Sequence, residues 1–339
     1  MIYEIKCCVP CQCVGSAAAR ERSPVADHRT PARPRTGWSR LAAASAALNA
    51  WGIRAERAAR RTNGSTIRRR RAAELAGAPG CWAPRCAVHW HEGGAGQPLL
   101  LLNGFAASGL VWPGSWVRDL KQRFRVIRID NRGTGWSRNA PAPFTIADLA
   151  DDAAAVLDAI GVEKAVILGF SMGGVIAQEL AVRHPDRIAR LILVSTIPPA
   201  PAHVPTDLRV LMPPPARIPV GSRSQSELLA RFYLGTSARA FHPEPEVVDE
   251  LAAQLHARQT PVISALQQWR ASIAWRGPGR LAAITAPTTI VTGAADPIVR
   301  ARNGDTLARL IPGARCVEFT DVGHLVPWEA PETLSRLLE

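Results

Sequence analysis

A tight junction between a strand and a helix constrains this chain of 339 residues more than any other feature of its sequence. The segment AVILGFSMGGVIAQELA, residues 165–181, opens with an apolar run typical of a buried strand and continues with helical spacing. Ser171 lies at the junction, and Gly169 and Gly173 flank it. Glycines there leave room that a Cβ atom would occupy in a sharp turn. The segment therefore predicts a strand–turn–helix unit that exposes the Ser171 hydroxyl at the end of its strand.

From about residue 86 onward, short apolar runs alternate with helical patterns. The apolar runs that predict buried parallel strands lie at 98–103, 125–130, 165–169, 190–195, 288–293 and 315–319. Between two of them, Thr145 and Asp148 form a predicted capping box, and Gly161 closes the same helix. Alternation of this kind predicts an α/β fold with a doubly wound, mostly parallel sheet that has helices on both faces.

The alternation is interrupted between residues 197 and 284, where the pattern becomes helical. The expected helices lie at 224–235, 246–258 and 262–275. A helical insertion between two strands of one sheet predicts a lid rather than an independent domain. We therefore expect a core made of residues 86–196 and 285–339, with residues 197–284 inserted as a helical cap.

Residues 1–80 differ from this body in composition. They hold 15 Lys and Arg against 5 Asp and Glu, whereas residues 81–339 hold 26 against 23. The net charge of +13 therefore belongs mainly to the extension, and the body has no strong positive charge that would attract nucleic acid. We expect residues 1–80 to be a low-order extension, rich in Arg, Ala and Pro, without a catalytic role.

The cysteines and the hydropathy pattern bear on location. The chain has seven cysteines, an odd number, which favours a reducing compartment and hence a cytoplasmic location. Four of them, Cys7, Cys8, Cys11 and Cys13, crowd near the start. A metal site is one interpretation of this cluster, but no second ligand pair has zinc-finger spacing, so free thiols are favoured. No apolar run reaches about 18 residues, so no membrane span is expected.

Two more residues complete a pattern of nucleophile, base and acid. Asp296 and His324 each follow the end of a predicted strand, as Ser171 does. Because the carboxyl ends of parallel strands share one edge of a sheet, we expect the three side chains to meet there. A serine hydroxyl becomes a strong nucleophile when a base, itself oriented by an acid, lies within hydrogen-bond reach. Asp321 is the alternative acid, and Asp296 is favoured because it has its own strand-end loop.

With these motifs, the chain from about residue 86 to residue 339 resembles the α/β-hydrolase family. LLNGFAASGLVW, residues 101–112, resembles the oxyanion loop of the family, and DNRGTGWS, residues 130–137, resembles its glycine-rich turn. The order Ser, Asp, His along the chain is also that of the family. The resemblance is strongest to lidded enzymes such as enol-lactonases, simple esterases and cofactor-free haloperoxidase-like hydrolases.

This resemblance implies a serine hydrolase that cleaves a carboxylic ester, a lactone or a related acyl bond through an acyl-enzyme. It implies Ser171 as the nucleophile, His324 as the base and Asp296 as the acid that orients it. It also places the backbone amides of Phe105 and Met172 in the oxyanion hole.

One position departs from the family pattern. Asn103 stands before Gly104 where many members have histidine, but the donors of the hole are backbone amides, so the hole is expected to survive. In the predicted cap, Phe232, Trp269 and Trp275 are candidate walls of an apolar pocket, with ordinary packing as the equal alternative. The expected partner is a small apolar acyl substrate.

Two other functions remain open at this point. An acyltransferase would use the same triad, and a non-catalytic small-ligand receptor could keep the same fold. No cofactor is expected, because no glycine-rich nucleotide loop is present. No metal is expected either: His89 and His91 alternate along an early strand, where a surface position is favoured. Neither nucleic acid nor a membrane is an expected partner, and the oligomeric state is left open.

Overall fold

The structure is a computed structural model, and it describes residues 5–7, 88–138, 142–205, 226, 230, 243–277 and 281–338. Apart from residues 5–7, the predicted extension 1–80 lies outside the described residues, and so does Phe232. Of the predicted helix 224–235, the structure describes only Ser226 and Ala230, both of which are helical.

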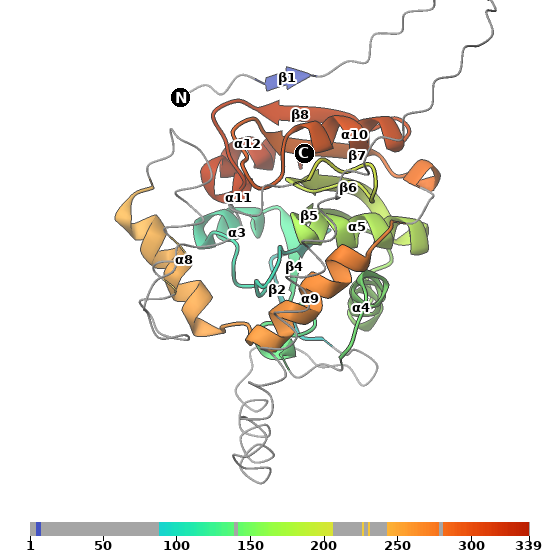
Figure 1. Cartoon of the computed structure of the whole chain (residues 1–339). Coiled ribbons are helices and arrows are strands. Elements are labelled where there is room, and N and C mark those ends of the chain that lie inside the picture. Colours follow the sequence, from blue (N-terminus) through green and yellow to red (C-terminus); the bar gives the residue numbers. More distant parts are fainter. Residues whose placement is uncertain are drawn as a thin grey trace, which may run out of the picture. The chain divides into compact units, whose positions relative to one another are not determined.

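Eight strands form one sheet in the order β1-β8-β7-β6-β5-β3-β4-β2 (Figure 1). The strands are β1 (Ile5–Cys7), β2 (Trp90–Gly93), β3 (Gln97–Leu102), β4 (Phe124–Ile129), β5 (Ala165–Phe170), β6 (Ile188–Val194), β7 (Thr288–Gly293) and β8 (Arg315–Phe319). The edge strands β1 and β2 pair antiparallel with β8 and β4, and all other pairings are parallel. The predicted mostly parallel sheet is therefore confirmed.

The strand order reverses at β5, which positions the functional edge. From β5 the chain adds β6, β7 and β8 on one side, whereas β3 and β4 lie on the other. In open α/β sheets, ligands bind beyond the carboxyl ends of the strands at such a reversal. Ser171 directly follows β5 and therefore lies at this point.

Helices connect the strands. The helices are α3 (Gly114–Leu120), α4 (Ile146–Ala159), α5 (Met172–Arg183), α8 (Pro245–Ala257), α9 (Val262–Ala274), α10 (Arg302–Leu310), α11 (Val326–Glu329) and α12 (Pro331–Arg336). Single 3₁₀ turns lie at Gly135–Ser137, Pro185–Arg187 and Leu281–Ala283. The predicted capping box of α4 is confirmed: the Asp148 amide donates to Thr145 Oγ1 at 3.2 Å, and the Thr145 amide donates to Asp148 Oδ2 at 2.7 Å.

Alternate side chains of the central strands enter two separate hydrophobic cores. On β3, Leu100 and Leu102 pack with α4 and α5, whereas Leu99 and Leu101 pack with α3 and α12. All four leucines are fully buried. Burial of each such side chain contributes about 2 kcal/mol, so the period-two pattern fixes the register of the sheet.

The described part of the insertion between β6 and β7 contacts both cores. Val248 and Leu251 of α8 are buried in the core on the α3 side. Ala271 of α9 is buried in the core on the α5 side. In the cartoon, α8 lies on the side of α3, whereas α9 runs toward α5 (Figure 1). The two helices are thus fastened to opposite layers.

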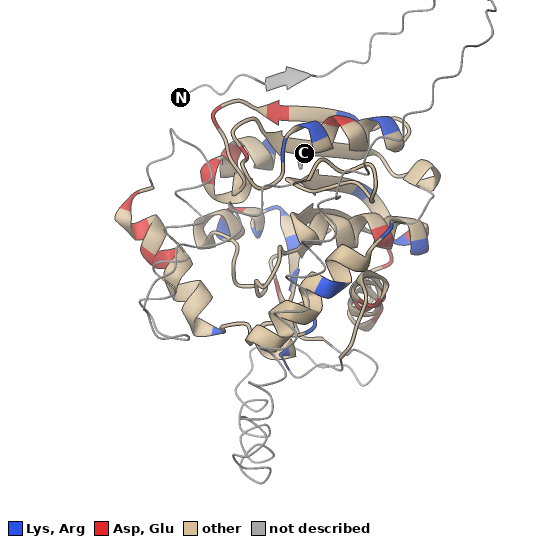
Figure 2. Ribbon diagram, viewed as in Figure 1, with Lys and Arg blue, Asp and Glu red and all other residues tan. Residues whose placement is uncertain are grey.

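The described helices carry charges of both signs (Figure 2). Acidic side chains gather on α8, whereas α10 carries acidic and basic side chains together (Figure 2). Within the described residues, none of the helices is both long enough and apolar enough to cross a membrane.

Candidate active site

The turn after β5 holds Ser171 in a strained backbone conformation. Its φ is +54° and its ψ is −118°, in a region that non-glycine residues rarely adopt. Close packing explains the neighbouring glycines. A Cβ atom on Gly173 would lie 2.0 Å from the Leu102 carbonyl oxygen, and one on Gly169 would lie 2.4 Å from the Gly173 carbonyl oxygen. The predicted reason for these glycines is therefore confirmed.

Hydrogen bonds fix this turn on both sides of the serine. The Ser171 amide donates to the Val194 carbonyl of β6 at 2.9 Å. The Ser171 carbonyl accepts from Thr196 Oγ1 at 2.7 Å and from the Gly174 amide at 2.9 Å. Strain of this kind persists at functional sites only where the surroundings hold it. The side chain of Ser171 is therefore held at one fixed place on the edge of the sheet where the parallel strands end, here called the rim.

The structure brings together the side chains of Ser171, His324 and Asp296, as the sequence predicted. His324 Nε2 lies 3.1 Å from Ser171 Oγ, and His324 Nδ1 lies 2.8 Å from Asp296 Oδ2. The other carboxylate oxygen of Asp296 accepts from the amides of Ile298 and Val299, both at 2.8 Å. Because Oδ1 is fixed in this way, Oδ2 faces the imidazole. Asp296 and His324 are only 6% and 5% exposed.

The position of Asp321 separates the two candidate acids. Asp321 is exposed to solvent, whereas Asp296 is buried and in contact with His324. The geometry therefore favours Asp296, as the sequence did.

Glu329, which the sequence pattern did not single out, fixes the loop that carries His324. The buried carboxylate of Glu329 accepts from the Gly323 amide at 2.8 Å and from the Leu325 amide at 2.9 Å. These amides flank His324, so Glu329 holds the backbone on both sides of the base. The available signal was an acid five residues after the histidine, in GHLVPWEAPE, which the short helix α11 turns back toward the loop.

The segment Asn103–Trp112, here called the oxyanion loop, lies against the serine. A Cβ atom on Gly104 would be 3.4 Å from Ser171 Cβ. Asn103 is fully buried, and its Nδ2 donates to the Ala107 carbonyl within the same loop. Phe105 is 43% exposed. The departure from the family pattern at Asn103 is thus accommodated by a local hydrogen bond.

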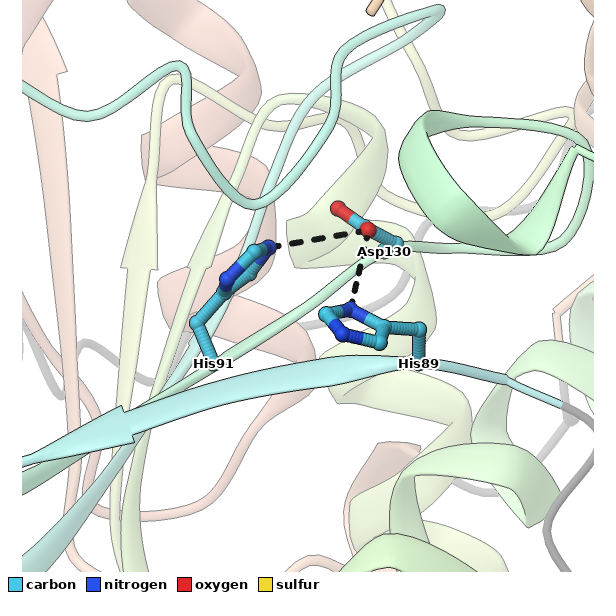
Figure 3. Close-up of side chains that lie close together, drawn as sticks. All are labelled: His89, His91 and Asp130. Carbon is cyan, nitrogen blue, oxygen red and sulfur yellow. Dashed lines mark ion pairs between the residues drawn. The ribbon is translucent and has the colours of Figure 1, made fainter. Parts of the chain in front are cut away.

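A buried cluster of two histidines and an aspartate lies beside this loop (Figure 3). Asp130 Oδ2 lies 3.2 Å from His89 Nδ1 and 3.6 Å from His91 Nε2. The predicted surface position of these histidines is wrong, because His89 is 0% and His91 is 7% exposed. The histidines are buried because other residues cover this side of the strand. The Trp136 ring stacks on the His89 ring, with 5.1 Å between the ring centroids.

Asp130 joins the oxyanion loop to the glycine-rich turn. Its Oδ1 accepts from the Gly109 amide at 2.7 Å, and its Oδ2 accepts from the Trp136 amide at 2.9 Å. Burial alone would raise the pKa of Asp130, but hydrogen bonds from His89, His91 and the Trp136 amide outweigh burial and hold that pKa well below its ordinary value. The carboxylate therefore stays ionised as the anchor of the loop.

The donor atoms of the cluster lie within 4.8 Å of one another, a spacing that a metal ion would accept. Two observations favour a structural role for Asp130, as the anchor of the loop, over a role as a metal ligand. Both oxygens of Asp130 already accept backbone amides. Arg128, which pairs with His91 across β2 and β4, is a half-buried cation whose pKa is lowered by burial and raised by the Asp130 charge. A cation thus already lies beside this carboxylate.

The remaining pocket candidates lie on or next to α9. Trp275 donates its indole N–H to Glu179 Oε2 at 3.0 Å and packs against the core on the α5 side. Trp269 is half-buried. The contacts of Trp275 fasten the end of α9 to α5.

Comparisons with known proteins agree with this architecture. Residues 97–331 match the model of the alpha/beta hydrolase fold family. RutD of Azorhizobium caulinodans, named for carbamate hydrolysis, is 31% identical over 251 residues, which cover 74% of this chain and 93% of that protein. Rhodomycin D methylesterase DauP of Streptomyces sp. is 32% identical over 287 residues and covers the same shares.

A solved structure gives the same result. The enol-lactonase from Burkholderia xenovorans LB400 is 25% identical and superposes with a TM-score of 0.60, over 74% of this chain and 94% of that one. These three findings agree with the topology and the rim described above: the family match covers most of the chain, a relative above 30% identity is covered over nearly its full length, and the fold is shared. The chain is a hydrolase of the α/β-hydrolase fold family.

Proposed function

We propose that this hydrolase cleaves a carboxylic ester or lactone through an acyl-enzyme formed on Ser171. The observation that carries the proposal is the continuous chain of contacts from Ser171 Oγ through His324 to Asp296, at 3.1 and 2.8 Å. A serine, an imidazole and a buried carboxylate in this order are the groups that acyl transfer requires.

In the proposed mechanism, Ser171 Oγ attacks the carbonyl carbon and His324 Nε2 takes its proton. His324 then gives this proton to the leaving alcohol as the carbonyl re-forms. Asp296 keeps the imidazole in the tautomer that has its proton on Nδ1, and it stabilises the imidazolium. A water molecule, deprotonated by His324, attacks the acyl-enzyme and releases the acid and Ser171.

The developing oxyanion is proposed to receive the backbone amides of Phe105 and Met172. Met172 is the first residue of α5, where unpaired amides and the helix dipole favour negative charge. Phe105 follows Gly104, which packs against Ser171. Two preorganised donors of this kind are worth about 10² to 10³ each in turnover.

The proposed substrate is a small apolar acyl compound. Apolar rings lie on one side of the base: Phe170 lies 5.1 Å from the His324 ring, between ring centroids, and Trp112 lies 6.1 Å from Phe170. The names of the relatives include a methylesterase and an enol-lactonase, both of which act at an acyl carbonyl. An ester or lactone with apolar substituents fits this rim best.

A panel of p-nitrophenyl butyrate, a five-membered lactone and an aryl carbamate tests the proposal, with and without an added alcohol. We expect hydrolysis of the ester or the lactone, and a loss of about 10⁶ in kcat for Ser171→Ala with an unchanged circular dichroism spectrum. Transfer to the alcohol in preference to water would indicate an acyltransferase instead. Retained turnover in Ser171→Ala would refute the proposal.

A further inference from the structure

The cap holds both backbone groups of one residue in the oxyanion loop. The Ala106 amide donates to Gln268 Oε1 at 2.8 Å, and the Ala106 carbonyl accepts from Thr260 Oγ1 at 2.8 Å. Gln268 lies on α9 and is fully buried, and Thr260 lies just before that helix. Ala106 directly follows Phe105, so these two side chains act next to the proposed oxyanion donor.

Ala106 needs such support because its backbone is strained. Its φ is +54°, a left-handed conformation that alanine rarely adopts. A residue in this conformation persists when its surroundings over-determine it. Here the determinants come from residues more than 150 positions away in the chain. Without them, the peptide between Phe105 and Ala106 is free to turn toward a relaxed conformation, and the backbone of Phe105 turns with it.

Gln268 also binds the second loop at the rim. Its Nε2 donates to the Arg132 carbonyl at 3.1 Å, within the glycine-rich turn. Ser264, on the same helix, packs against Gly133 so closely that a Cβ atom there would lie 2.7 Å from Ser264 Cβ. One amide side chain thus satisfies an N–H of one loop and a C=O of the other, which glutamate or methionine cannot do.

We propose that Gln268 and Thr260 are positioning residues that set the orientation of the Phe105 amide, so that the oxyanion hole is complete only when α9 is seated on the loop. The inference rests on the proposed hydrolase function and on Phe105 as a donor. It makes the cap part of the catalytic apparatus: displacement of α9 breaks both bonds to Ala106 and releases the loop.

The cap also provides a matched control. Gln254, on α8, donates from Nε2 to the Trp112 carbonyl at 3.3 Å, at the far end of the same loop. Gln254→Met therefore removes a cap-to-loop hydrogen bond of the same type at a distance of seven residues from Phe105. A general loosening of the cap would lower activity in the variants of both glutamines, whereas loss of the positioning contact would lower it only in the Gln268 variant.

The test compares Gln268→Met, Thr260→Val, Thr260→Ser and Gln254→Met with the wild-type chain on the ester or lactone that it hydrolyses. For Gln268→Met and Thr260→Val we expect kcat to fall between about 10-fold and 10²-fold, because one oxyanion donor is displaced rather than deleted. KM stays within threefold. The inhibition constant of a trifluoromethyl ketone, whose adduct with Ser171 carries an oxyanion, rises by the same factor as kcat falls. Thr260→Ser restores the wild-type values, and Gln254→Met keeps kcat within twofold.

Hydrogen exchange at the amides of residues 103–112 gives a readout that does not depend on turnover. Exchange becomes at least tenfold faster at Phe105 and Ala106 in Gln268→Met, and it remains unchanged there in Gln254→Met. An unchanged kcat or ketone affinity in a folded Gln268→Met would overturn the inference, and so would an equal loss in Gln254→Met. If the wild-type chain hydrolyses none of the substrates, the proposed function fails. Unchanged exchange in Gln268→Met would then separately overturn the role of Gln268 in positioning the loop.

Discussion

The turn that carries Ser171 and the oxyanion loop face each other across the same rim, yet they are held in different ways. The turn depends first on glycines of its own segment: Gly169 and Gly173, two residues away on either side, make the close approach possible, and hydrogen bonds with Val194 and Thr196 then hold Ser171 in place. The oxyanion loop is determined at a distance. Its anchors are Asp130, Thr260 and Gln268, which contact it from 21 to 162 positions away in the chain.

Because of this difference, substitutions have different effects at the two places. A change within the turn alters the backbone of the proposed nucleophile itself, whereas the loop can be altered by changing residues far away in the chain. The predictions below test this contrast, starting with the largest expected effect.

The largest effect outside the proposed nucleophile is expected at Asp296, the proposed acid. Asp296→Asn keeps the size of the side chain but removes the charge that orients His324, so kcat falls by about 10⁴ while the fold is retained. Steady-state hydrolysis of the ester measures this loss. Asp321→Asn is the control, with kcat within twofold of the wild type. A large loss in Asp321→Asn together with an active Asp296→Asn would reverse the assignment.

The next effect concerns the distant anchor of the loop. Asp130→Asn removes a buried carboxylate that accepts from two backbone amides, and we expect the free energy of unfolding to fall by about 3 kcal/mol at pH 7. Urea denaturation measures the change. The exposed Asp158 supplies the control, because Asp158→Asn changes stability by no more than about 0.5 kcal/mol.

The pH dependence of this difference has a definite sign. The pKa of Asp130 is lowered in the folded protein, so its contribution is fully present above the unfolded value of about 3.9 and is lost as the pH falls toward the folded value. The stability gap between the wild type and Asp130→Asn therefore shrinks as the pH falls below about 4. A gap that widens below pH 4 would contradict the anchoring role.

The smallest effect is expected at the strained residue of the loop. Ala106→Gly relieves the positive φ but adds freedom to the unfolded chain, so the two terms offset and the free energy of unfolding stays within about 1 kcal/mol of the wild type. Ala107→Gly has no strain to relieve and lowers it by about 1 kcal/mol. Thermal denaturation of both variants decides the point: equal destabilisation would mean that Ala106 is not strained.

Elements with strong local patterns were predictable from the sequence. Six strands, the capping box at Thr145 and the helices at 245–257 and 262–274 lie where the apolar spacing places them. The meeting of Ser171, Asp296 and His324 was also predictable, because each follows the carboxyl end of a parallel strand and such ends share an edge.

The contacts between distant segments were not predictable in the same way. His89 and His91 alternate as surface residues would, and their burial depends on a layer that includes Trp136 and was not apparent from the pattern of the strand. In the sequence, Gln268 looks like any polar residue of an amphipathic helix. Its role is apparent only from its contacts with the distant loops. Hydropathy periodicity reports which face of an element is covered, and it carries no information about which backbone group a polar side chain will meet.

The most direct measurement is the intact mass of the protein after reaction with a fluorophosphonate, followed by peptide mapping. The account predicts a single stoichiometric adduct on Ser171, with labelling reduced at least 10³-fold in His324→Ala and absent in Ser171→Ala. An adduct on another residue, or unchanged labelling in His324→Ala, would contradict it.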